Sequence, residues 1–224
     1  MNKYIAEFIG TFFLVLTIGC TGIGAGAGVI APLAIGAVLM AMVFAGGHIS
    51  GAHYNPAVTI GILIRGKVKG SDVLPYMIAQ VLAAVLAGLI VSKYLRAGIV
   101  VTPMAPNVSH ALLAEFLFTF ALVYVVLNAA TAEGTSGNSF YGLAIGITVM
   151  AGAFAVGDIS GGAFNPAVAV GISVLGISSW SNLWIYLVAN FAGAIAAALV
   201  FNMINAPAQT TPIATDEPPY ETPQ

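Results

Sequence analysis

Long apolar stretches alternate with short polar segments along this chain. Six stretches are 17 to 22 residues long, and their apolar residues run on without the period-two alternation of a strand. About 20 apolar residues in a helix cross the hydrocarbon core of a bilayer, where the backbone must satisfy its own hydrogen bonds. We therefore predict an all-α membrane protein with six transmembrane helices, at 4–23, 30–46, 74–95, 111–130, 140–156 and 183–204.

Two shorter apolar stretches, 56–64 and 166–175, are each preceded by the tripeptide Asn-Pro-Ala. The two copies are Asn55-Pro56-Ala57 and Asn165-Pro166-Ala167. Asparagine is a favoured N-cap, and proline suits the first helical position because its missing N–H would be unpaired there. At about 1.5 Å per residue such a helix reaches only about halfway across the bilayer core. We predict two re-entrant half-helices.

The composition supports a membrane protein. Of 224 residues 59% are hydrophobic and 6% charged, with a mean hydropathy of +1.00, whereas soluble domains carry roughly 25% charged residues. The net charge of −2, with six Lys and Arg, predicts no nucleic-acid partner. The single cysteine, Cys20, forms no internal disulfide. No metal cluster, phosphate loop or nucleophile–base pair is apparent in the sequence, so we expect no metal, no cofactor and no enzyme activity.

The few basic residues indicate an orientation. Four of them fall on one side of the predicted spans and two on the other, and the positive-inside rule then places the N-terminus in the cytoplasm. The two groups are Lys3, Arg65, Lys67 and Lys69, and Lys93 with Arg96. Residues 206–224 are rich in Pro and Thr with three acids, which predicts a disordered cytoplasmic tail. The short loops suggest a multi-pass protein of a prokaryotic cytoplasmic (plasma) membrane.

The two halves of the chain repeat each other. The segment AEFIGTF at 6–12 reappears as AEFLFTF at 114–120, and GHISGAHYNPAV at 47–58 as GDISGGAFNPAV at 157–168. Gln80 in the third span falls opposite Asn190 in the sixth. With three full spans in each half, the second half must be inverted in the membrane, which places a site at the interface near the midplane. We expect one channel domain, 1–205, with repeats at about 4–97 and 111–205.

Two boxes in an inverted repeat bring two helix N-termini together, each carrying roughly half a positive charge. We expect both asparagine amides to point into a lumen, where a dipolar solute can accept their hydrogen bonds while a cation is repelled. The glycine-rich loops 47–54 and 157–164 are predicted to be non-helical and to offer carbonyl oxygens along the path. One box alone would more often cap a surface helix; two in matching frames indicate a pore.

The chain resembles the aquaporins, the major intrinsic protein family, over about residues 4–204. The resemblance rests on both boxes, on the pairs Glu7/Thr11 and Glu115/Thr119, and on GHISG at 47–51. It implies six spans with two half-helices, a homotetramer with one pore per subunit, and passive conduction of water or small neutral solutes through the lipid bilayer.

Glu7 and Glu115 are acids inside apolar spans, which costs roughly 2.5–3.5 kcal/mol each on insertion scales. We interpret them as acceptors that hold the loop of their own half-helix, and the alternative is a pair of carriers in a proton-coupled transporter. His48 and His53 are expected to pack or support the first loop, the alternative being a pH sensor. Asp158 replaces His48 in the second repeat, where it either caps the loop or attracts solutes.

The resemblance also locates a selectivity filter of four residues, usually including an arginine directly after the second box. That position is Val168, and spacing from the boxes adds Gly162, Ile35 and Ala153. Valine lacks the charge and five N–H donors of arginine, so we expect a wide, apolar filter that admits glycerol, urea or undissociated metalloid acids besides water. The alternative is a strictly water-selective pore in which a neighbouring side chain refills the space. The function that we rank last is a structural membrane protein whose pore is occluded.

Overall fold

The computed structural model describes residues 1–205, and the predicted tail at 206–224 lies outside the described residues. Six long helices have the length and hydropathy of membrane spans, with η2 (Val91–Leu95) continuing the third. They are α1 (Asn2–Gly22), α2 (Ala31–Ser50), α4 (Gly70–Ile90), α5 (Val108–Thr131), α6 (Tyr141–Ser160) and α8 (Leu183–Ile204). Two nine-residue helices, α3 (Pro56–Ile64) and α7 (Pro166–Val174), complete the set. The six spans and two half-helices are confirmed.

The two loops predicted to be non-helical, 47–54 and 157–164, begin later in the chain than predicted. α2 and α6 each run four residues further than expected and end at Ser50 and Ser160. Gly51 and Gly161 then adopt left-handed backbone, with φ of 87° and 93°, and donate their N–H groups to the carbonyls of Gly47 and Gly157. A glycine in this conformation is a common helix C-cap because it lacks a Cβ. The non-helical segments are therefore only 51–55 and 161–165.

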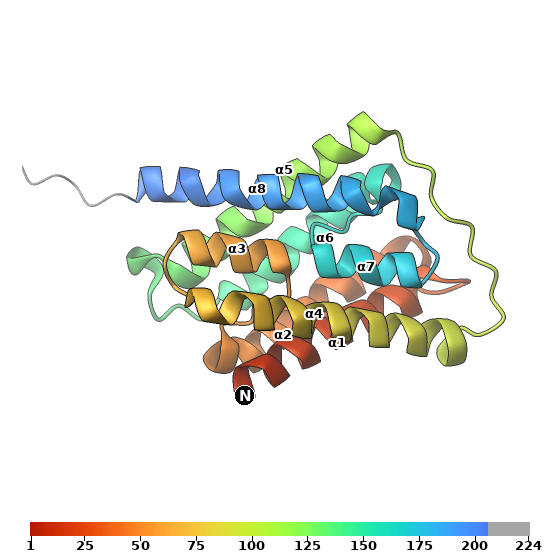
Figure 1. Cartoon of the computed structure of the whole chain (residues 1–224), viewed down its shortest axis with the longest axis horizontal. Helices are drawn as coiled ribbons and strands as arrows, with labels where there is room; N and C mark the ends of the chain where they lie inside the picture. The colour runs from red at the N-terminus through yellow and green to blue at the C-terminus, as the bar shows by residue number, and fades with distance from the viewer. Residues whose placement is uncertain (206–224) are drawn as a thin grey trace, which may run out of the picture.

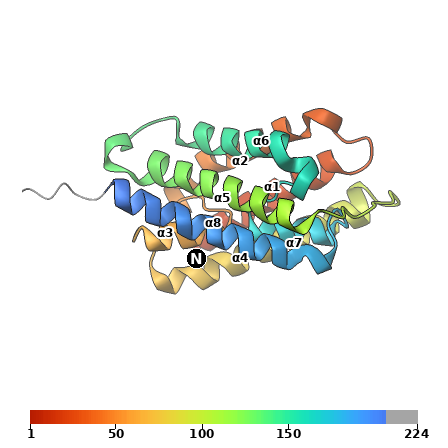
Figure 2. The same ribbon diagram turned by 90° about the horizontal axis from the view of Figure 1, so that it is seen from above.

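The two halves pack in matching ways. α1 contacts α2 and α4, α5 contacts α6 and α8, and α2 meets α6. Each half-helix also packs against the last long helix of the other half, α3 on α8 and α7 on α4. Figure 1 shows α3 and α7 lying end to end between α8 and α4. From above, α2 and α6 run along one face of the bundle and α3, α4 and α7 along the opposite face (Figure 2).

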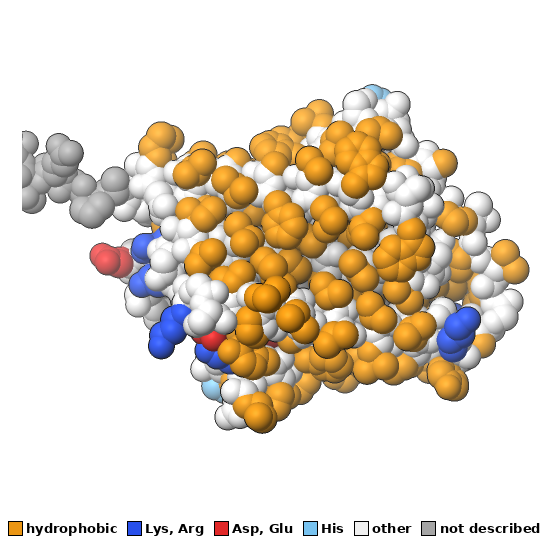
Figure 3. Space-filling view, viewed as in Figure 1, with side chains coloured by type: hydrophobic (Ala, Val, Ile, Leu, Met, Phe, Trp, Pro, Cys, Tyr) orange, Lys and Arg blue, Asp and Glu red, His pale blue; other side chains and the backbone are white. Residues whose placement is uncertain are grey.

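The outer surface suits a lipid environment. Apolar side chains cover the flank of the bundle, while Lys and Arg gather at its two ends (Figure 3). The exposed Leu, Ile, Val and Phe side chains come from all six long helices. The N-terminus and the end of α8 lie at the same end of the bundle (Figure 1), as six crossings require. The chain is therefore an integral multi-pass membrane protein.

Candidate pore

Each Asn-Pro-Ala box starts its half-helix as the sequence predicts. Asn55 and Asn165 have extended backbone, with φ of −158° and −162°. The Asn55 Oδ1 atom accepts hydrogen bonds from the N–H groups of Ala57 (2.8 Å) and Val58 (3.4 Å). Asn165 Oδ1 accepts the equivalent bonds at 2.9 and 3.4 Å. Two of the otherwise unpaired N–H groups of each helix start are thereby satisfied.

Each box asparagine also binds the residue that precedes the other box, across the repeat interface. Asn55 Nδ2 donates to the carbonyl oxygen of Phe164, and Asn165 Nδ2 donates to that of Tyr54, both at 2.9 Å. Each asparagine amide therefore uses one N–H within the protein and keeps one that can serve as the expected donor to the lumen. The N-termini of α3 and α7 meet head to head, so their positive dipole ends add near the middle of the bundle.

The Glu7 carboxylate accepts hydrogen bonds from the first loop and its neighbours. Its Oε1 atom accepts from the Ser50 hydroxyl (2.7 Å) and the His53 N–H (2.9 Å). Its Oε2 atom accepts from the Tyr54 N–H (2.6 Å) and the Gln80 amide (2.8 Å). The side chain is fully buried, and four donors compensate for the loss of water around its carboxylate.

Glu115 repeats this arrangement in the second half. It accepts from the Ser160 hydroxyl (2.7 Å), from the N–H groups of Ala163 and Phe164 (2.9 and 2.7 Å) and from the Asn190 amide (2.8 Å). Both carboxylates therefore act on the loops that precede the boxes. This geometry matches the loop-supporting role and leaves a carrier role without a free oxygen lone pair directed at a pathway.

The loops contain residues in left-handed backbone that are not glycine. Ala52, Tyr54 and Phe164 have φ of 51°, 51° and 48°. Such a conformation costs roughly 1–2 kcal/mol for an ordinary L-residue, and it persists only where the surroundings impose it. The N–H groups of Tyr54 and Phe164 are held by the two glutamates. Both aromatic rings are buried, and a Cβ on Gly10 would overlap the ring of Tyr54.

A narrow cavity of about 60 Å³ passes the two boxes. Asn55, Asn165 and all four expected filter residues line it, together with apolar side chains of α1, α2, α5 and α6. The structure therefore brings together Ile35, Ala153, Gly162 and Val168, which the sequence places in three different segments. Val168 is buried, and no Lys, Arg, Asp or Glu is among the described residues that line this cavity.

The loops also offer free backbone acceptors along this cavity. The carbonyls of 51–53 and 161–163 accept no hydrogen bond from any described residue. Ala52, His53 and 161–163 line the cavity. The predicted acceptors are thus present, although the carbonyls of Tyr54 and Phe164 are taken by the asparagines.

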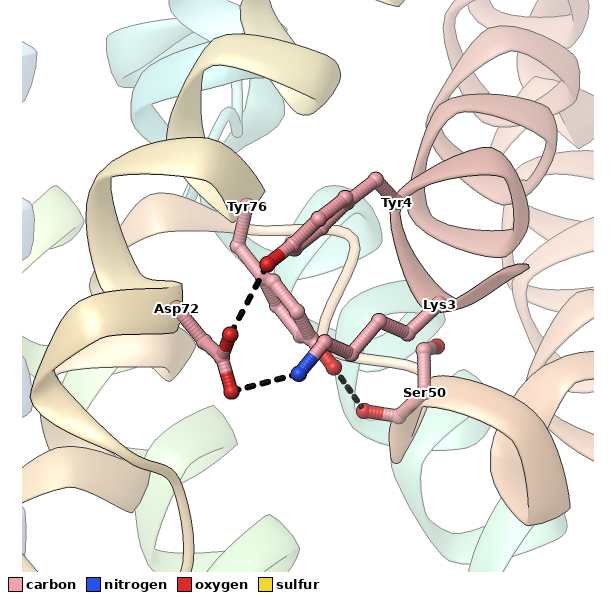
Figure 4. A network of polar contacts seen from close by, with 5 residues as sticks. All are labelled: Lys3, Tyr4, Ser50, Asp72 and Tyr76. Atoms are coloured by element: carbon pink, nitrogen blue, oxygen red, sulfur yellow. Dashed lines mark hydrogen bonds and ion pairs between the residues drawn. The ribbon is translucent and has the colours of Figure 1, made fainter. Parts of the chain in front are cut away.

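A second, wider cavity of about 1040 Å³ opens at one end of the bundle. Lys67 and Lys69 line it, and we call this opening the basic mouth; the opposite opening, beside Ala153 and Gly162, is the far mouth. A polar network lies at the basic mouth (Figure 4). Asp72 accepts from Lys3 (2.6 Å) and Tyr4 (2.8 Å), and Tyr76 donates to the Ser50 carbonyl (2.8 Å).

Two polar residues do not have the places expected from sequence. His48 is exposed on the last turn of α2 and has no hydrogen bond to a described residue, so the loop-supporting role assigned to it is wrong. His53 takes that role: it is buried, its N–H binds Glu7, and its Nδ1 lies 3.1 Å from Thr59 Oγ1. Asp158 is likewise exposed on α6 and caps no described loop N–H. Both corrections follow from the helices continuing to Ser50 and Ser160.

Sequence reasoning missed several residues that hold the loops. Ser50 and Ser160 bind the two glutamates, and Tyr76 and Tyr186 bind the serine carbonyls at 2.8 and 2.7 Å. Each pair recurs at the same spacing as the boxes. Polar residues repeated at that spacing within apolar spans were the signal that could have identified them.

Comparison with known proteins agrees with this architecture. Residues 1–201 match the model of the family described as major intrinsic protein. "Aquaporin NIP1-4" of Oryza sativa subsp. japonica is 36% identical over 91% of this chain and 77% of its own. "Glycerol uptake facilitator protein-like 6" of Lactiplantibacillus plantarum is 37% identical over 88% and 95%. The solved aquaglyceroporin from Plasmodium falciparum has the same fold, with a TM-score of 0.74 at 21% identity, covering 91% of this chain and 96% of that one.

Proposed function

The chain belongs to the major intrinsic protein family, and on that premise we propose that its pore conducts water together with neutral solutes as large as glycerol. Proteins of this family are passive channels for water and small neutral solutes, so this chain is a channel and not an enzyme. The observation that carries the wider range is the set of side chains beside the second box. Val168, Ala153 and Gly162 line the narrow cavity there, and none of them carries a charge or a side-chain donor.

The physical argument concerns what these residues omit. An arginine after the second box would fill the far mouth and add a fixed charge with five N–H donors. With valine, the far mouth excludes larger solutes less by size and imposes fewer hydrogen bonds on them. The remaining amide N–H of each box asparagine and the free loop carbonyls still offer donors and acceptors to a polyol or to urea. A relative named for glycerol uptake supports this range.

Exclusion of ions then falls mainly on the boxes. Two helix N-termini meet there, and their dipoles oppose a cation. No acidic side chain among the described residues lines the narrow cavity to offset that field. We therefore expect neutral solutes to pass and small cations to be strongly disfavoured.

We further propose the setting of the channel. The basic mouth faces the cytoplasm of a plasma membrane, because four of the six basic residues lie at that end. The N-terminus and the end of α8 lie there too, and on this orientation both chain ends are cytoplasmic. Residues 1–205 form one channel domain from repeats at about 4–97 and 111–205, and the family resemblance supports a homotetramer with one pore in each subunit.

The rival functions make different use of the same residues. A proton-coupled transporter needs carboxyl groups that load and release protons, yet Glu7 and Glu115 each accept four hydrogen bonds from their loops. A strictly water-selective pore needs a group that refills the space left by the arginine. Among the described residues, no Lys or Arg lines the cavity to do so.

Stopped-flow permeability of proteoliposomes tests the proposal, with water, urea and glycerol as solutes. We expect wild type to pass all three, and Val168→Arg to lower glycerol and urea relative to water by on the order of tenfold or more. Val168→Leu is the matched control, because it adds bulk without charge or donors. Wild-type protein that passes water but neither larger solute would overturn the proposed range, as would an unchanged solute-to-water ratio in Val168→Arg.

A further inference from the structure

Several of the residues that line the path are identical in the two repeats. Under the two-fold relation Leu14 corresponds to Leu122, Ile35 to Ile145 and Val58 to Val168. With valine after both boxes, the pore lacks the strong polar asymmetry that an arginine at one end would give it. The positions at which the repeats differ therefore distinguish the two mouths.

Three of these differences place the larger residue on the basic-mouth side, whereas the pair Ile18 and Val126 has its larger residue toward the far end. Val43, Ala52 and His53 at the basic-mouth side correspond to Ala153, Gly162 and Ala163 at the far side. In each of these three pairs the residue on the basic-mouth side is the larger. The same backbone frame thus carries two extra methyl groups, one methyl group and an imidazole ring at one end only.

The narrow cavity and the vestibule meet beside these residues. Three residues, His53, Val126 and Ile145, line both the narrow cavity and the wide vestibule of the basic mouth. Because they line both cavities, they form the junction between the two spaces. Their side chains are only 7%, 7% and 6% exposed. Val43 lines the vestibule side of this junction and is 1% exposed.

His53 is held in one orientation at this junction. Its ring packs against Tyr76 with centroids 5.0 Å apart, and its Nδ1 contacts Thr59 Oγ1. The single Thr59 hydroxyl proton goes to the Asn55 carbonyl (3.0 Å), so this oxygen accepts from Gln80 (3.2 Å) and from Nδ1–H of neutral His53. Nε2 is then an acceptor, and it has no hydrogen-bond partner among the described residues.

We propose that the selecting constriction of this pore lies at the basic mouth, where Val43, His53, Val126 and Ile145 set its size and Nε2 of His53 accepts a hydrogen bond from the passing solute. The inference rests on the proposed function, because it presupposes a permissive far mouth. It specifies the solutes as slim neutral molecules with O–H or N–H donors, such as short linear polyols and urea. Such molecules can bind Nε2 and the loop carbonyls in turn while their carbon atoms contact the valines and isoleucine.

Exchanging residues between the mouths tests this constriction. Val43→Ala gives the basic mouth the residue of the far mouth, and Ala153→Val makes the converse change. Permeabilities to water, urea, glycerol and erythritol would be measured in proteoliposomes. We expect Val43→Ala and His53→Ala to raise erythritol relative to water by on the order of tenfold, and Ala153→Val to change this ratio much less.

Two results decide against the constriction. One is an unchanged erythritol ratio in Val43→Ala and His53→Ala; the other is a large fall in Ala153→Val alone, which would place selection at the far mouth. If His53→Ala is not monodisperse on size-exclusion chromatography, Val43→Ala decides. If wild type passes water alone, the proposed solute range is wrong, and the constriction is then judged from Val43→Ala. Glycerol passage through this variant would still support the constriction. No glycerol passage would overturn it.

Discussion

Asn55 donates a side-chain N–H to the backbone carbonyl oxygen of Phe164 at 2.9 Å, 109 residues further along the chain. Asn165 makes the equivalent bond to Tyr54 at the same distance. Each asparagine thus caps its own half-helix through Oδ1 and ties that helix to the opposite loop through Nδ2. The box is a joint between the repeats as well as a helix start, which explains why both copies need an amide rather than another capping side chain.

Replacing the box asparagines separates these two roles. Asn165→Ala removes the capping oxygen and the donor, whereas Asn165→Ser keeps a hydroxyl that can cap. We expect the alanine variant to lose about 1 kcal/mol more unfolding free energy than the serine variant, the usual value of an N-cap. Unfolding of the detergent-solubilised protein by SDS measures the difference.

The same pair of substitutions at Asn55 is the control, because its hydrogen bonds match those of Asn165. Equal losses at the two sites are expected. If serine and alanine were equally destabilising at both sites, Oδ1 capping would contribute little, and the cross-repeat bond would account for the loss.

Replacing Glu7 or Glu115 by glutamine should damage the channel equally in either half. One carboxylate oxygen becomes an amide group, which then faces two protein donors and leaves at least one buried N–H unpaired, at a cost of about 1–3 kcal/mol. The loop residues in left-handed backbone lose part of their support. We expect lower unfolding free energy and lower water permeability for Glu7→Gln and Glu115→Gln.

Glu133→Gln is the matched control, since Glu133 is exposed beside the basic mouth. It should behave as wild type. Glycerol flux through wild type should also rise linearly with its gradient and ignore an imposed pH gradient. Saturable flux that follows the pH gradient and is lost in Glu7→Gln would instead support a coupled transporter.

The crossing of α2 and α6 depends on two glycines. A Cβ on Gly36 would lie 2.7 Å from the Gly146 carbonyl oxygen, and one on Gly146 would lie 2.5 Å from the Gly36 carbonyl. Backbones this close have no room for a side chain, as at other small-residue contacts between membrane helices. We expect Gly36→Ala or Gly146→Ala to cost about 1–3 kcal/mol of stability through overpacking.

Gly157→Ala, also on α6, provides the comparison. A Cβ there meets no atom within 4 Å, so its effect should be small or slightly stabilising through helix propensity, by up to about 1 kcal/mol. Thermal unfolding in detergent would rank the three variants. If Gly157→Ala had the lowest unfolding temperature of the three variants, close packing at Gly36 and Gly146 would not be what limits stability.

The spans were predictable because membrane helices are marked by long, continuous apolar stretches. The half-helices were predictable because each begins with a strong helix-start signal. The helix ends were not. The glycine-rich segment 47–54 was predicted to be non-helical, yet α2 stays helical until Ser50 and only Gly51 turns left-handed. That shift of one helical turn moves His48 to the surface and leaves His53 in the loop, so only one of the two histidines lies where it was expected.

The four residues expected in the filter line one cavity, and they could be chosen from spacing because the repeats are gapless around the boxes; their role in selectivity stays a prediction. The loop supports were harder to find. A serine or tyrosine in an apolar span looks the same in sequence whether it faces lipid, packs, or binds a carboxylate. Only the fold brings Ser50 and Tyr76 together, 26 positions apart, with Glu7 on a third helix.

The ion pair between Lys3 and Asp72 has no equivalent in the second repeat, where Asn182 takes the place of the acid. Asp72 also accepts from Tyr4, so one carboxylate binds the first turn of α1 to the start of α4 (Figure 4).

Asp72→Asn weakens both bonds, and we expect faster hydrogen–deuterium exchange in a peptide covering residues 1–10. The effect should be smaller at high salt, since Lys3 is 34% exposed and its attraction to Asp72 is already screened in wild type. Asn182→Ala is the control, because the Asn182 side chain makes only a 3.4 Å bond to the Met104 carbonyl among the described residues and does not bind Lys3 or Tyr4. Equal exchange in Asp72→Asn and wild type at low salt would show that apolar packing of α1 on α4 holds this end without the ion pair.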